Sequence, residues 1–202
     1  MEDLYYKLKQ DKYKSTLKET SRDDSKTGRN DIKYMTESEE EVINYDAVKN
    51  HYIEGMGLSV APKSVDALFI VDGESSYIIE FKNGVIDNAE CYSIQKKVYD
   101  SLLILLDRIG KNISFSREHI HFILVYNEDV EHMSKFFDED KFEKRKKKFN
   151  YYRDKIVKRS KLLADDNYTQ FGLRYFKKMY FKTVNTFTKK EFDFWISNNL
   201  YK

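Results

Sequence analysis

The chain has 202 residues, of which 41% are hydrophobic and 35% are charged, and its formal net charge is +2. This length and composition are typical of one folded domain with a sizeable core, and they exclude a disordered chain. The longest aliphatic run, at 102–106, is too short to span a bilayer, and the N-terminus has no signal-peptide pattern. A single cysteine, Cys91, excludes an intrachain disulfide, so we expect a cytoplasmic protein without a membrane partner.

Charge is distributed unevenly along the chain. Residues 1–140 contain 18 Lys and Arg against 28 Asp and Glu, a net charge of −10. Residues 141–202 contain 18 against 6, a net charge of +12. A basic segment attached to an acidic body indicates a polyanionic partner such as nucleic acid, although the two parts could also attract each other within one fold.

The first predicted element is a helix that begins near Thr36. Residues 1–35 before it are the least core-like part of the chain, and we expect them to form a peripheral N-terminal segment. Capping-box patterns begin at both Thr36 and Ser38, and apolar residues recur at helical spacing from Val42 to Tyr52. Gly55 is placed to end this helix.

Two strands are predicted next, at residues 66–71 and 77–82. The loop between them contains the hairpin signal Asp72-Gly73. A long helix over residues 89–109 follows, and Gly110 is placed to end it.

The remaining elements complete an α/β fold. Residues 119–126 predict a strand that is apolar enough for burial on both faces, and residues 140–164 predict a basic helix. A strand at 179–187 and a helix opened by a capping box at 188–191 end the chain. We therefore predict one domain, 1–202, with a central mixed β-sheet flanked by helices and a largely helical basic C-terminal part at 140–202.

The hairpin brings three charged side chains together. Antiparallel pairing about Gly73 makes paired residue numbers sum to about 146, which sets Asp66 opposite Glu80 with Cβ atoms about 5 Å apart. Side chains alternate along a strand, so Glu80 and Lys82 share a face and Phe81 points to the other. Two carboxylates and an ammonium therefore converge on one end of the hairpin.

This convergence predicts a metal site with hydrolytic chemistry. Facing carboxylates repel each other, and a hard divalent cation between them removes that cost. Mg²⁺ binds through one or two carboxylates and keeps several waters, one of which can become a nucleophile. A neighbouring lysine can position or deprotonate that water, or stabilise the charge that develops on a phosphate.

The residues Lys63-Ser64-Val65-Asp66, followed by an apolar strand and Ile78-Ile79-Glu80-Phe81-Lys82, resemble the motif of the PD-(D/E)XK nuclease superfamily. The resemblance covers residues 37–126 and extends to Holliday junction resolvases and RecB-like members. It implies a restriction-endonuclease-like core at 36–126 and DNA cleavage with Mg²⁺ or Mn²⁺. It also implies that Asp66, Glu80 and the backbone carbonyl of Phe81 bind the metal and that Lys82 is catalytic. One departure is Pro62, which stands four residues before Asp66 instead of next to it.

Many members of this superfamily add a glutamate from the preceding helix. Glu37, Glu39, Glu40 and Glu41 are the candidates, and Glu41 is preferred because it shares the predicted helical stripe of Tyr45. Glu37, one turn earlier, is the reserve. Acidic residues also favour a first helical turn for dipole reasons alone, so a solvated helix start is the alternative.

Further residues are predicted to contact nucleic acid. Gln95-Lys96-Lys97-Val98-Tyr99 matches the Gln-x-x-x-Tyr motif of RecB-like members, although a helix face with a core tyrosine would have the same pattern. Lys144, Arg145 and Lys148 in the basic C-terminal part would contact phosphates, or form a solvated face. His119 and His121 share a predicted strand face, but a zinc site is not expected without a third ligand.

These patterns predict a metal-dependent endonuclease that acts on DNA and possesses an active site at Asp66, Glu80 and Lys82, with Glu41 as a fourth member. Two alternatives stay open. One is a non-catalytic nucleic-acid-binding or assembly module of the same fold, and the other is an RNA nuclease. A homodimer is a further expectation, because many relatives cut as dimers.

Overall fold

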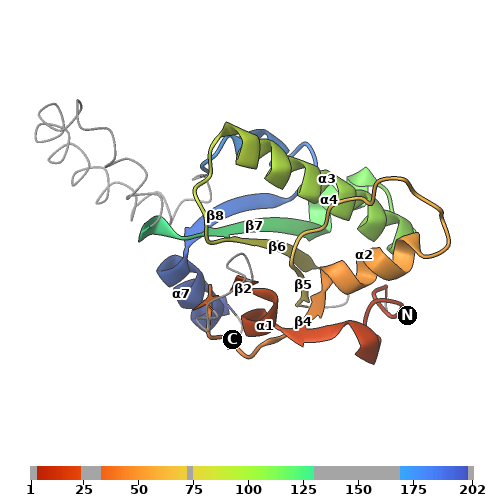
Figure 1. Ribbon diagram of the computed structural model, residues 1–202, viewed down its shortest axis with the longest axis horizontal. Coiled ribbons are helices and arrows are strands. Elements are labelled where there is room, and N and C mark those ends of the chain that lie inside the picture. Colours follow the sequence, from red (N-terminus) through yellow and green to blue (C-terminus); the bar gives the residue numbers. More distant parts are fainter. Residues whose placement is uncertain (1–3, 24–32, 72–74, 130–168, 200–202) are drawn as a thin grey trace, which may run out of the picture.

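A computed structural model describes residues 4–23, 33–71, 75–129 and 169–199. Its centre is a mixed six-stranded sheet in the order β1-β4-β5-β6-β7-β8 (Figure 1). The strands are β1 (Lys14–Thr16), β4 (Glu41–Asn44), β5 (Ala67–Ile70), β6 (Ser76–Lys82), β7 (Ile120–Tyr126) and β8 (Thr183–Thr188). Two short strands, β2 (Arg22–Asp23) and β3 (Lys33–Tyr34), form a second sheet. The predicted α/β fold with a mixed sheet is confirmed.

Helices cover both faces of the large sheet (Figure 1). The apolar side chains of α2 (Tyr45–Ile53) and α3 (Asn88–Ile109) belong to the core on one face, and those of α1 (Leu17–Thr20) and α7 (Lys189–Asn199) belong to the core on the other. The short helix α4 (Ile113–His119) leads into β7, and the 3-10 helices are η1 (Asp11–Tyr13) and η3 (Leu173–Phe176). No helix among the described residues is long and apolar enough to cross a membrane.

Successive side chains of each strand point to opposite faces of the sheet, and they therefore belong to two separate cores. In β6, Ile78 packs into the core beneath α3, whereas Ile79 and Phe81 pack into the core beneath α7. In β5, Leu68 faces α3 and Phe69 faces α7 in the same way. Any side chain on the Ile78 side of β6 therefore lies under α3, and this places Glu80 there.

The hairpin has the register that the sequence predicts. Strands β5 and β6 are antiparallel, with Ala67 opposite Ile79 and Phe69 opposite Tyr77, so each pair sums to 146. Asp66 directly precedes β5, and its N–H donates to the Ile79 carbonyl at 3.2 Å. Residues 72–74 of the predicted hairpin loop lie outside the described residues.

The predicted helix ends after the hairpin are also confirmed. The Asp87 side chain accepts a hydrogen bond from the Glu90 N–H at 2.8 Å and caps the start of α3. Gly110 ends α3 with φ 65°, a left-handed conformation that glycine adopts without a Cβ penalty. At the start of α7, Thr188 and Glu191 exchange both bonds of a capping box, at 2.8 and 3.3 Å.

The helix predicted to begin near Thr36 is wrong at its start. The chain is extended there, and α2 begins only at Tyr45, after the Asn44 side chain accepts from the Ala47 N–H. The backbone of the extended segment forms hydrogen bonds with the N-terminal region. The Leu17 N–H donates to the Glu40 carbonyl at 3.0 Å, and β1 pairs with β4. Long-range pairing thus overrides a local capping pattern.

The described part of the predicted N-terminal segment, residues 4–23 and 33–35, contributes to the core instead of being peripheral to it. Tyr5, Leu8, Tyr13 and Leu17 are all buried, and β1 forms one edge of the large sheet. The strand predicted at 119–126 begins at Ile120, and the one predicted at 179–187 is found as β8. The basic helix predicted at 140–164 lies outside the described residues.

Candidate active site

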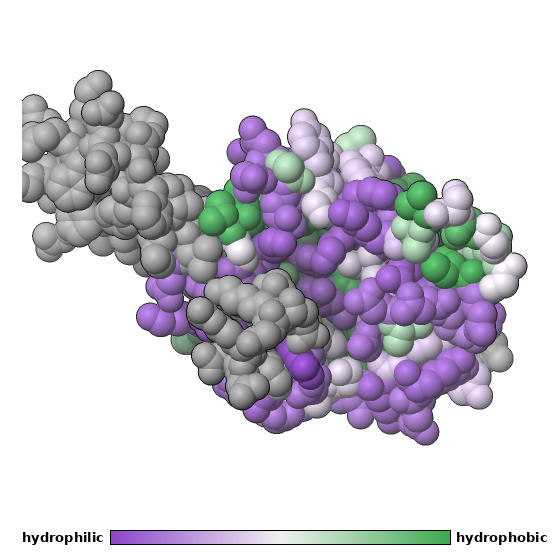
Figure 2. Space-filling model, in the orientation of Figure 1, coloured by the Kyte–Doolittle hydropathy of each residue, from purple (hydrophilic) through white to green (hydrophobic). Residues whose placement is uncertain are grey.

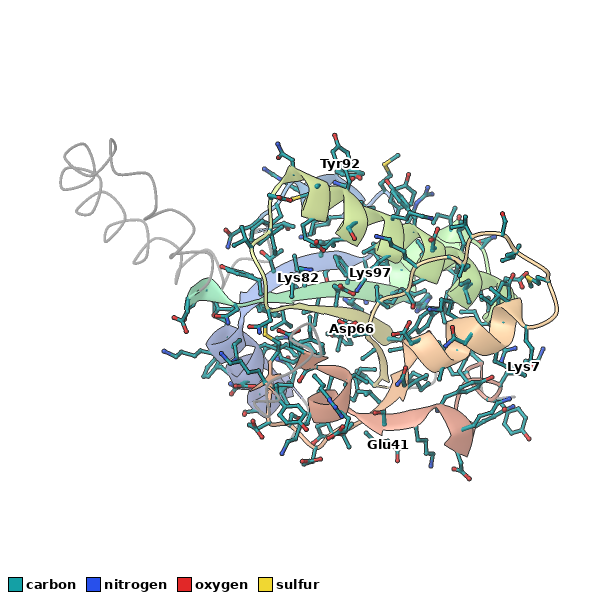
Figure 3. The ribbon with its side chains drawn as sticks, viewed as in Figure 1. Lys7, Glu41, Asp66, Lys82, Tyr92 and Lys97 are labelled. Carbon is teal, nitrogen blue, oxygen red and sulfur yellow. The ribbon has the colours of Figure 1, made fainter. Side chains whose placement is uncertain are left out.

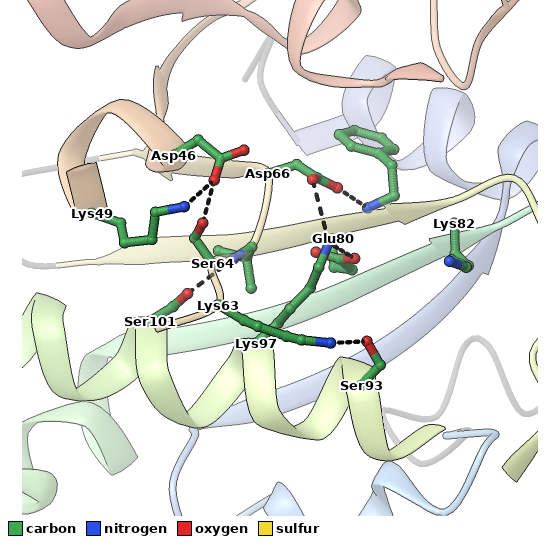
Figure 4. Close-up of polar contacts among 12 residues, drawn as sticks. Asp46, Lys49, Lys63, Ser64, Asp66, Glu80, Lys82, Ser93, Lys97 and Ser101 are labelled. Carbon is green, nitrogen blue, oxygen red and sulfur yellow. Dashed lines mark hydrogen bonds and ion pairs between the residues drawn. The ribbon is translucent and has the colours of Figure 1, made fainter. Parts of the chain in front are cut away.

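Asp66 and Glu80 lie together between the hairpin and α3 (Figure 4), and Figure 3 shows where Asp66 lies in the molecule. Only 1% of the Glu80 side chain and 21% of the Asp66 side chain are exposed. The Phe81 N–H donates to Oδ2 of Asp66 at 2.6 Å, which fixes that carboxylate against β6. The predicted convergence of the two carboxylates is therefore present in the structure.

Lys97 extends from α3 to both carboxylates (Figure 4). Its Nζ lies 2.5 Å from Oε1 of Glu80 and 3.8 Å from Oδ1 of Asp66. The sequence placed Lys97 among the nucleic-acid contacts, whereas here it is the cation of the carboxylate pair. We call Asp66, Glu80 and Lys97 the site cluster.

Burial dominates the electrostatics of the site cluster. It raises the pKa of Glu80 well above its usual value, and the charge of Asp66 adds to this effect although Lys97 opposes it. Burial also raises the pKa of Asp66 to about 6, against the charge of Lys97 and the Phe81 N–H. For Lys97, burial alone would lower the pKa, but the charges of Glu80 and Asp66 outweigh it and raise the pKa. One lysine therefore compensates two carboxylates incompletely.

Lys82 is on the predicted strand and on the same face as Glu80, but its side chain lies apart from the two carboxylates (Figure 4). Its Nζ pairs with Oε1 of Glu90, in the first turn of α3, at 2.9 Å. Its charge still lowers the pKa of Asp66 and of Glu80, as a smaller effect than that of Lys97. Lys82 thus lies at the rim of the site, paired with an acidic residue that the sequence did not single out.

Glu41, the predicted fourth member, is not in the site. It belongs to strand β4 instead of a helix, is 70% exposed, and pairs with Lys14 at 3.7 Å. It borders a shallow hollow with Ile70, away from Asp66 (Figure 3). The reserve candidate Glu37 pairs with Lys18 at 3.0 Å and does not join the site either. Both predictions fail because they depended on a helix that does not begin at Thr36.

Asp46 is the acidic residue that α2 actually brings near the site. It accepts hydrogen bonds from the Ser64 hydroxyl and from Nζ of Lys49, the latter at 2.9 Å. Burial favours a raised pKa for Asp46, but these hydrogen bonds outweigh it and lower the pKa, and the charge of Asp46 raises the pKa of Asp66. Asn44, a strong N-cap residue, was the sequence signal for a helix start just before Asp46.

Helix α3 holds the residues that precede Asp66. The Lys63 N–H donates to Oδ2 of Asp100 at 2.8 Å, and the Lys63 ammonium donates to Ser93 Oγ at the same distance. The Val65 N–H donates to the buried Ser101 hydroxyl at 2.9 Å. These bonds fix Asp66 relative to Lys97, which extends from the same helix.

The other predicted nucleic-acid contacts that the structure describes, at Gln95, Lys96 and Tyr99, have different environments. Lys96 is exposed and pairs with Asp100 at 2.6 Å, and Gln95 is half-buried. The ring of Tyr99 packs edge-on against Phe176, 5.1 Å away between centroids, which fits the alternative of a core tyrosine. Lys144, Arg145 and Lys148 lie outside the described residues.

The two histidines do not share a strand face. His119 ends α4 and stacks on Phe115, whereas His121 lies in β7. The ring Nδ1 of His121 is 2.7 Å from the Thr183 hydroxyl, and its ring stacks on Tyr77. Both rings therefore pack against an aromatic side chain, and the His121 ring is also within hydrogen-bonding distance of Thr183.

The site cluster has the donors that a hard divalent cation requires. Mg²⁺ needs only one or two protein carboxylates, because it keeps several waters. Oε2 of Glu80 is buried and has no hydrogen-bond partner among the described residues, so it is an acceptor without a donor. Within the same residues, no group of three or more His, Cys, Asp or Glu is arranged to hold a metal. Asp66 and Glu80 therefore fit Mg²⁺ or Mn²⁺ as a two-carboxylate site.

Comparisons with known proteins identify no relative. No protein-family model matches the chain, and no curated protein or solved structure is significantly similar to it. We therefore interpret the site from its residues and their geometry.

Proposed function

We propose that the chain is a metal-dependent nuclease that hydrolyses DNA phosphodiester bonds with Mg²⁺ or Mn²⁺. The observation that carries this proposal is the buried pair of Asp66 and Glu80, in which Oε2 of Glu80 lacks a donor. Carboxylates are rarely buried side by side without a functional reason, because each loses its hydration. The order β4-α2-β5-β6-α3-α4-β7 also supports a restriction-endonuclease-like core of the PD-(D/E)XK type.

Each residue of the site has a proposed role. Asp66 and Glu80 hold the metal, together with the backbone carbonyl of Phe81 that the superfamily resemblance implies. The bound ion supplies Lewis acidity and a water of lowered pKa. Lys82 leaves Glu90 and stabilises the charge on the reacting phosphate or orients the attacking water.

Basic residues near β8 support a polyanionic partner. Residues 169–190 contain six Lys and Arg and no Asp or Glu. They include η3 and β8, the strand at one edge of the sheet. Neutralising phosphate charge is the main source of affinity for nucleic acid, and such a segment suits that role. Hydrophilic side chains also cover much of the face in Figure 2.

Cleavage assays test the proposal directly. The wild-type protein is expected to nick or linearise plasmid DNA in Mg²⁺ or Mn²⁺, and Glu80→Gln and Lys82→Ala should each reduce the rate by about a thousandfold or more. Glu54→Gln is the matched control, because Glu54 is an exposed carboxylate that pairs with His51. Cleavage that persists in excess chelator, or that survives Glu80→Gln, would contradict a metal-dependent mechanism. RNA of the same sequence, assayed in parallel, separates the DNA nuclease from an RNA nuclease.

A second candidate is a non-catalytic nucleic-acid-binding or assembly module of the same fold. It is favoured by one observation: Lys97 and Glu90 already pair with the groups that catalysis would use. This candidate predicts that the protein binds nucleic acid without cutting it at saturating Mn²⁺. It also predicts that Glu80→Gln leaves the dissociation constant for DNA unchanged.

A further inference from the structure

Lys97 has the position and the charge of a cation bound to the carboxylate pair. Its Nζ contacts Oε1 of Glu80 at 2.5 Å and lies 3.8 Å from Oδ1 of Asp66, so it stands between the two side chains (Figure 4). Mg²⁺ and Mn²⁺ would use the same carboxylates. A lysine ammonium is a compact point charge on a flexible stem, which allows it to occupy such a position and to leave it.

The other lysine of the site does not compete for this position. Lys82 is engaged by Glu90 at 2.9 Å. Among the described residues, the two carboxylates of the site cluster form their ion pairs with Lys97. The Lys97 side chain can move toward solvent, because 26% of it is already exposed, whereas Glu80 is almost completely enclosed.

An ammonium and a divalent cation cannot both occupy the space between Asp66 and Glu80. Two positive charges at such a short distance repel each other strongly in a partly buried site. The ammonium also uses Oε1 of Glu80, one of the oxygens that an ion would need. Binding at this site therefore requires a change in the position of Lys97.

We propose that Lys97 is a resident counter-cation: in the metal-free protein its ammonium occupies the divalent-cation position between Asp66 and Glu80, and it withdraws when that ion binds. This inference rests on the proposed function, because it takes Asp66 and Glu80 as the metal ligands. It assigns to Lys97 a role distinct from that of Lys82. Lys97 stabilises the folded protein before metal is present, and it lowers the apparent metal affinity.

Calorimetric titration with Mn²⁺ alone tests this role. Lys97→Met removes the ammonium and keeps most of the aliphatic stem, and it should bind Mn²⁺ about tenfold more tightly than the wild-type protein. Lys96→Met, one residue earlier on α3, is the matched control and should change the affinity less than about twofold. Equal or weaker Mn²⁺ binding by Lys97→Met would overturn the inference.

A measurement on the wild-type chain covers the case in which Lys97→Met does not fold. Amine acylation, followed by peptide mass spectrometry, reports how accessible each lysine is. Saturating Mn²⁺ should accelerate acylation of Lys97 and leave that of Lys96 unchanged. Slower or unchanged acylation of Lys97 with Mn²⁺ bound would contradict its withdrawal.

The failure of this inference is distinguishable from the failure of the proposed function. If neither the wild-type protein nor Lys97→Met binds Mn²⁺, both the metal site and the role of Lys97 are wrong. If the wild-type protein binds Mn²⁺ in a way that depends on Glu80, but Lys97→Met gains no affinity, only the role of Lys97 is wrong.

Discussion

Two groups of carboxylates and lysines lie in different parts of the molecule, and they differ chiefly in burial. The site cluster lies at the start of β5, where Lys97 of α3 contacts Asp66 and Glu80. The second group, which we call the edge group, consists of Glu41 with Lys14 and Glu37 with Lys18. Its carboxylates are 70% and 76% exposed, respectively. Both groups consist of carboxylates paired with lysines, but only in the site cluster are the carboxylates largely shielded from water.

This difference shows why charge alone does not identify a site. Exposed ion pairs contribute between zero and about 1 kcal/mol to stability, because water screens them. A buried carboxylate needs a partner, and Glu80 has one oxygen without any among the described residues. A bound cation would therefore lower the free energy of the site cluster. The edge group needs no such cation, because water stabilises its charges.

The largest expected effect comes from removing the cation of the site cluster. Lys97→Met in the metal-free protein should lower the free energy of unfolding by about 3 kcal/mol, because it leaves Glu80 buried beside Asp66 without compensation. Lys18→Met in the edge group should lower it much less, because water screens the exposed pair with Glu37. Urea unfolding monitored by circular dichroism measures both. Equal effects would remove the contrast between the two groups.

The pH dependence of stability gives a second contrast. Asp66 has a folded-state pKa raised to about 6 from 3.8, so folding favours its protonated form. Its contribution to stability is therefore fully present below about pH 4 and is lost as pH rises through about 6. We expect Asp66 to account for a loss of up to about 3 kcal/mol in the metal-free protein; this part is absent in Asp66→Asn, whereas the loss that comes from the buried Glu80 remains. Urea unfolding at several pH values measures it, and wild-type stability that rises relative to Asp66→Asn over this window would contradict the assigned sign.

Replacing Ser101 should have a smaller effect on stability, and it should act on the site by changing the position of Asp66. Ser101→Ala leaves the buried Val65 N–H without its acceptor, and this should lower the free energy of unfolding by about 1–2 kcal/mol. It should also weaken Mn²⁺ binding, because Val65 precedes Asp66. Ser114→Ala, on the exposed first turn of α4, is the control. Unchanged Mn²⁺ affinity in Ser101→Ala would show that α3 does not position Asp66.

The smallest effect is expected at the edge group. Glu41→Gln should change Mn²⁺ affinity by less than about twofold, because Glu41 is exposed and pairs with Lys14. Calorimetric titration beside Glu80→Gln makes the comparison. A loss of Mn²⁺ binding in Glu41→Gln would show that Glu41 belongs to the metal site after all.

Local patterns predicted the parts of the molecule that local forces determine. The hairpin register follows from the loop and strand alternation, and it correctly placed Asp66 against Glu80. The limits of α3 follow from Asp87 and Gly110. These features depend on residues that are close in sequence, so a single chain was enough to predict them.

Long-range contacts determined what the sequence did not reveal. The segment that contains Glu41 is a strand because it pairs with β1, and the paired residues are 25 to 29 positions apart in the chain. Lys97 enters the site because α3 packs over β6, and no spacing within α3 indicates that it contacts Glu80. Glu90 engages Lys82 for the same reason. Side chains from separate elements meet only when tertiary packing brings them together.

A crystal structure obtained after soaking with Mn²⁺ tests the central claim most directly. The anomalous signal of Mn²⁺ should lie between the carboxylates of Asp66 and Glu80, with Nζ of Lys97 withdrawn from Glu80. No Mn²⁺ at these carboxylates under saturating conditions, with Lys97 still bound to Glu80, would contradict the account.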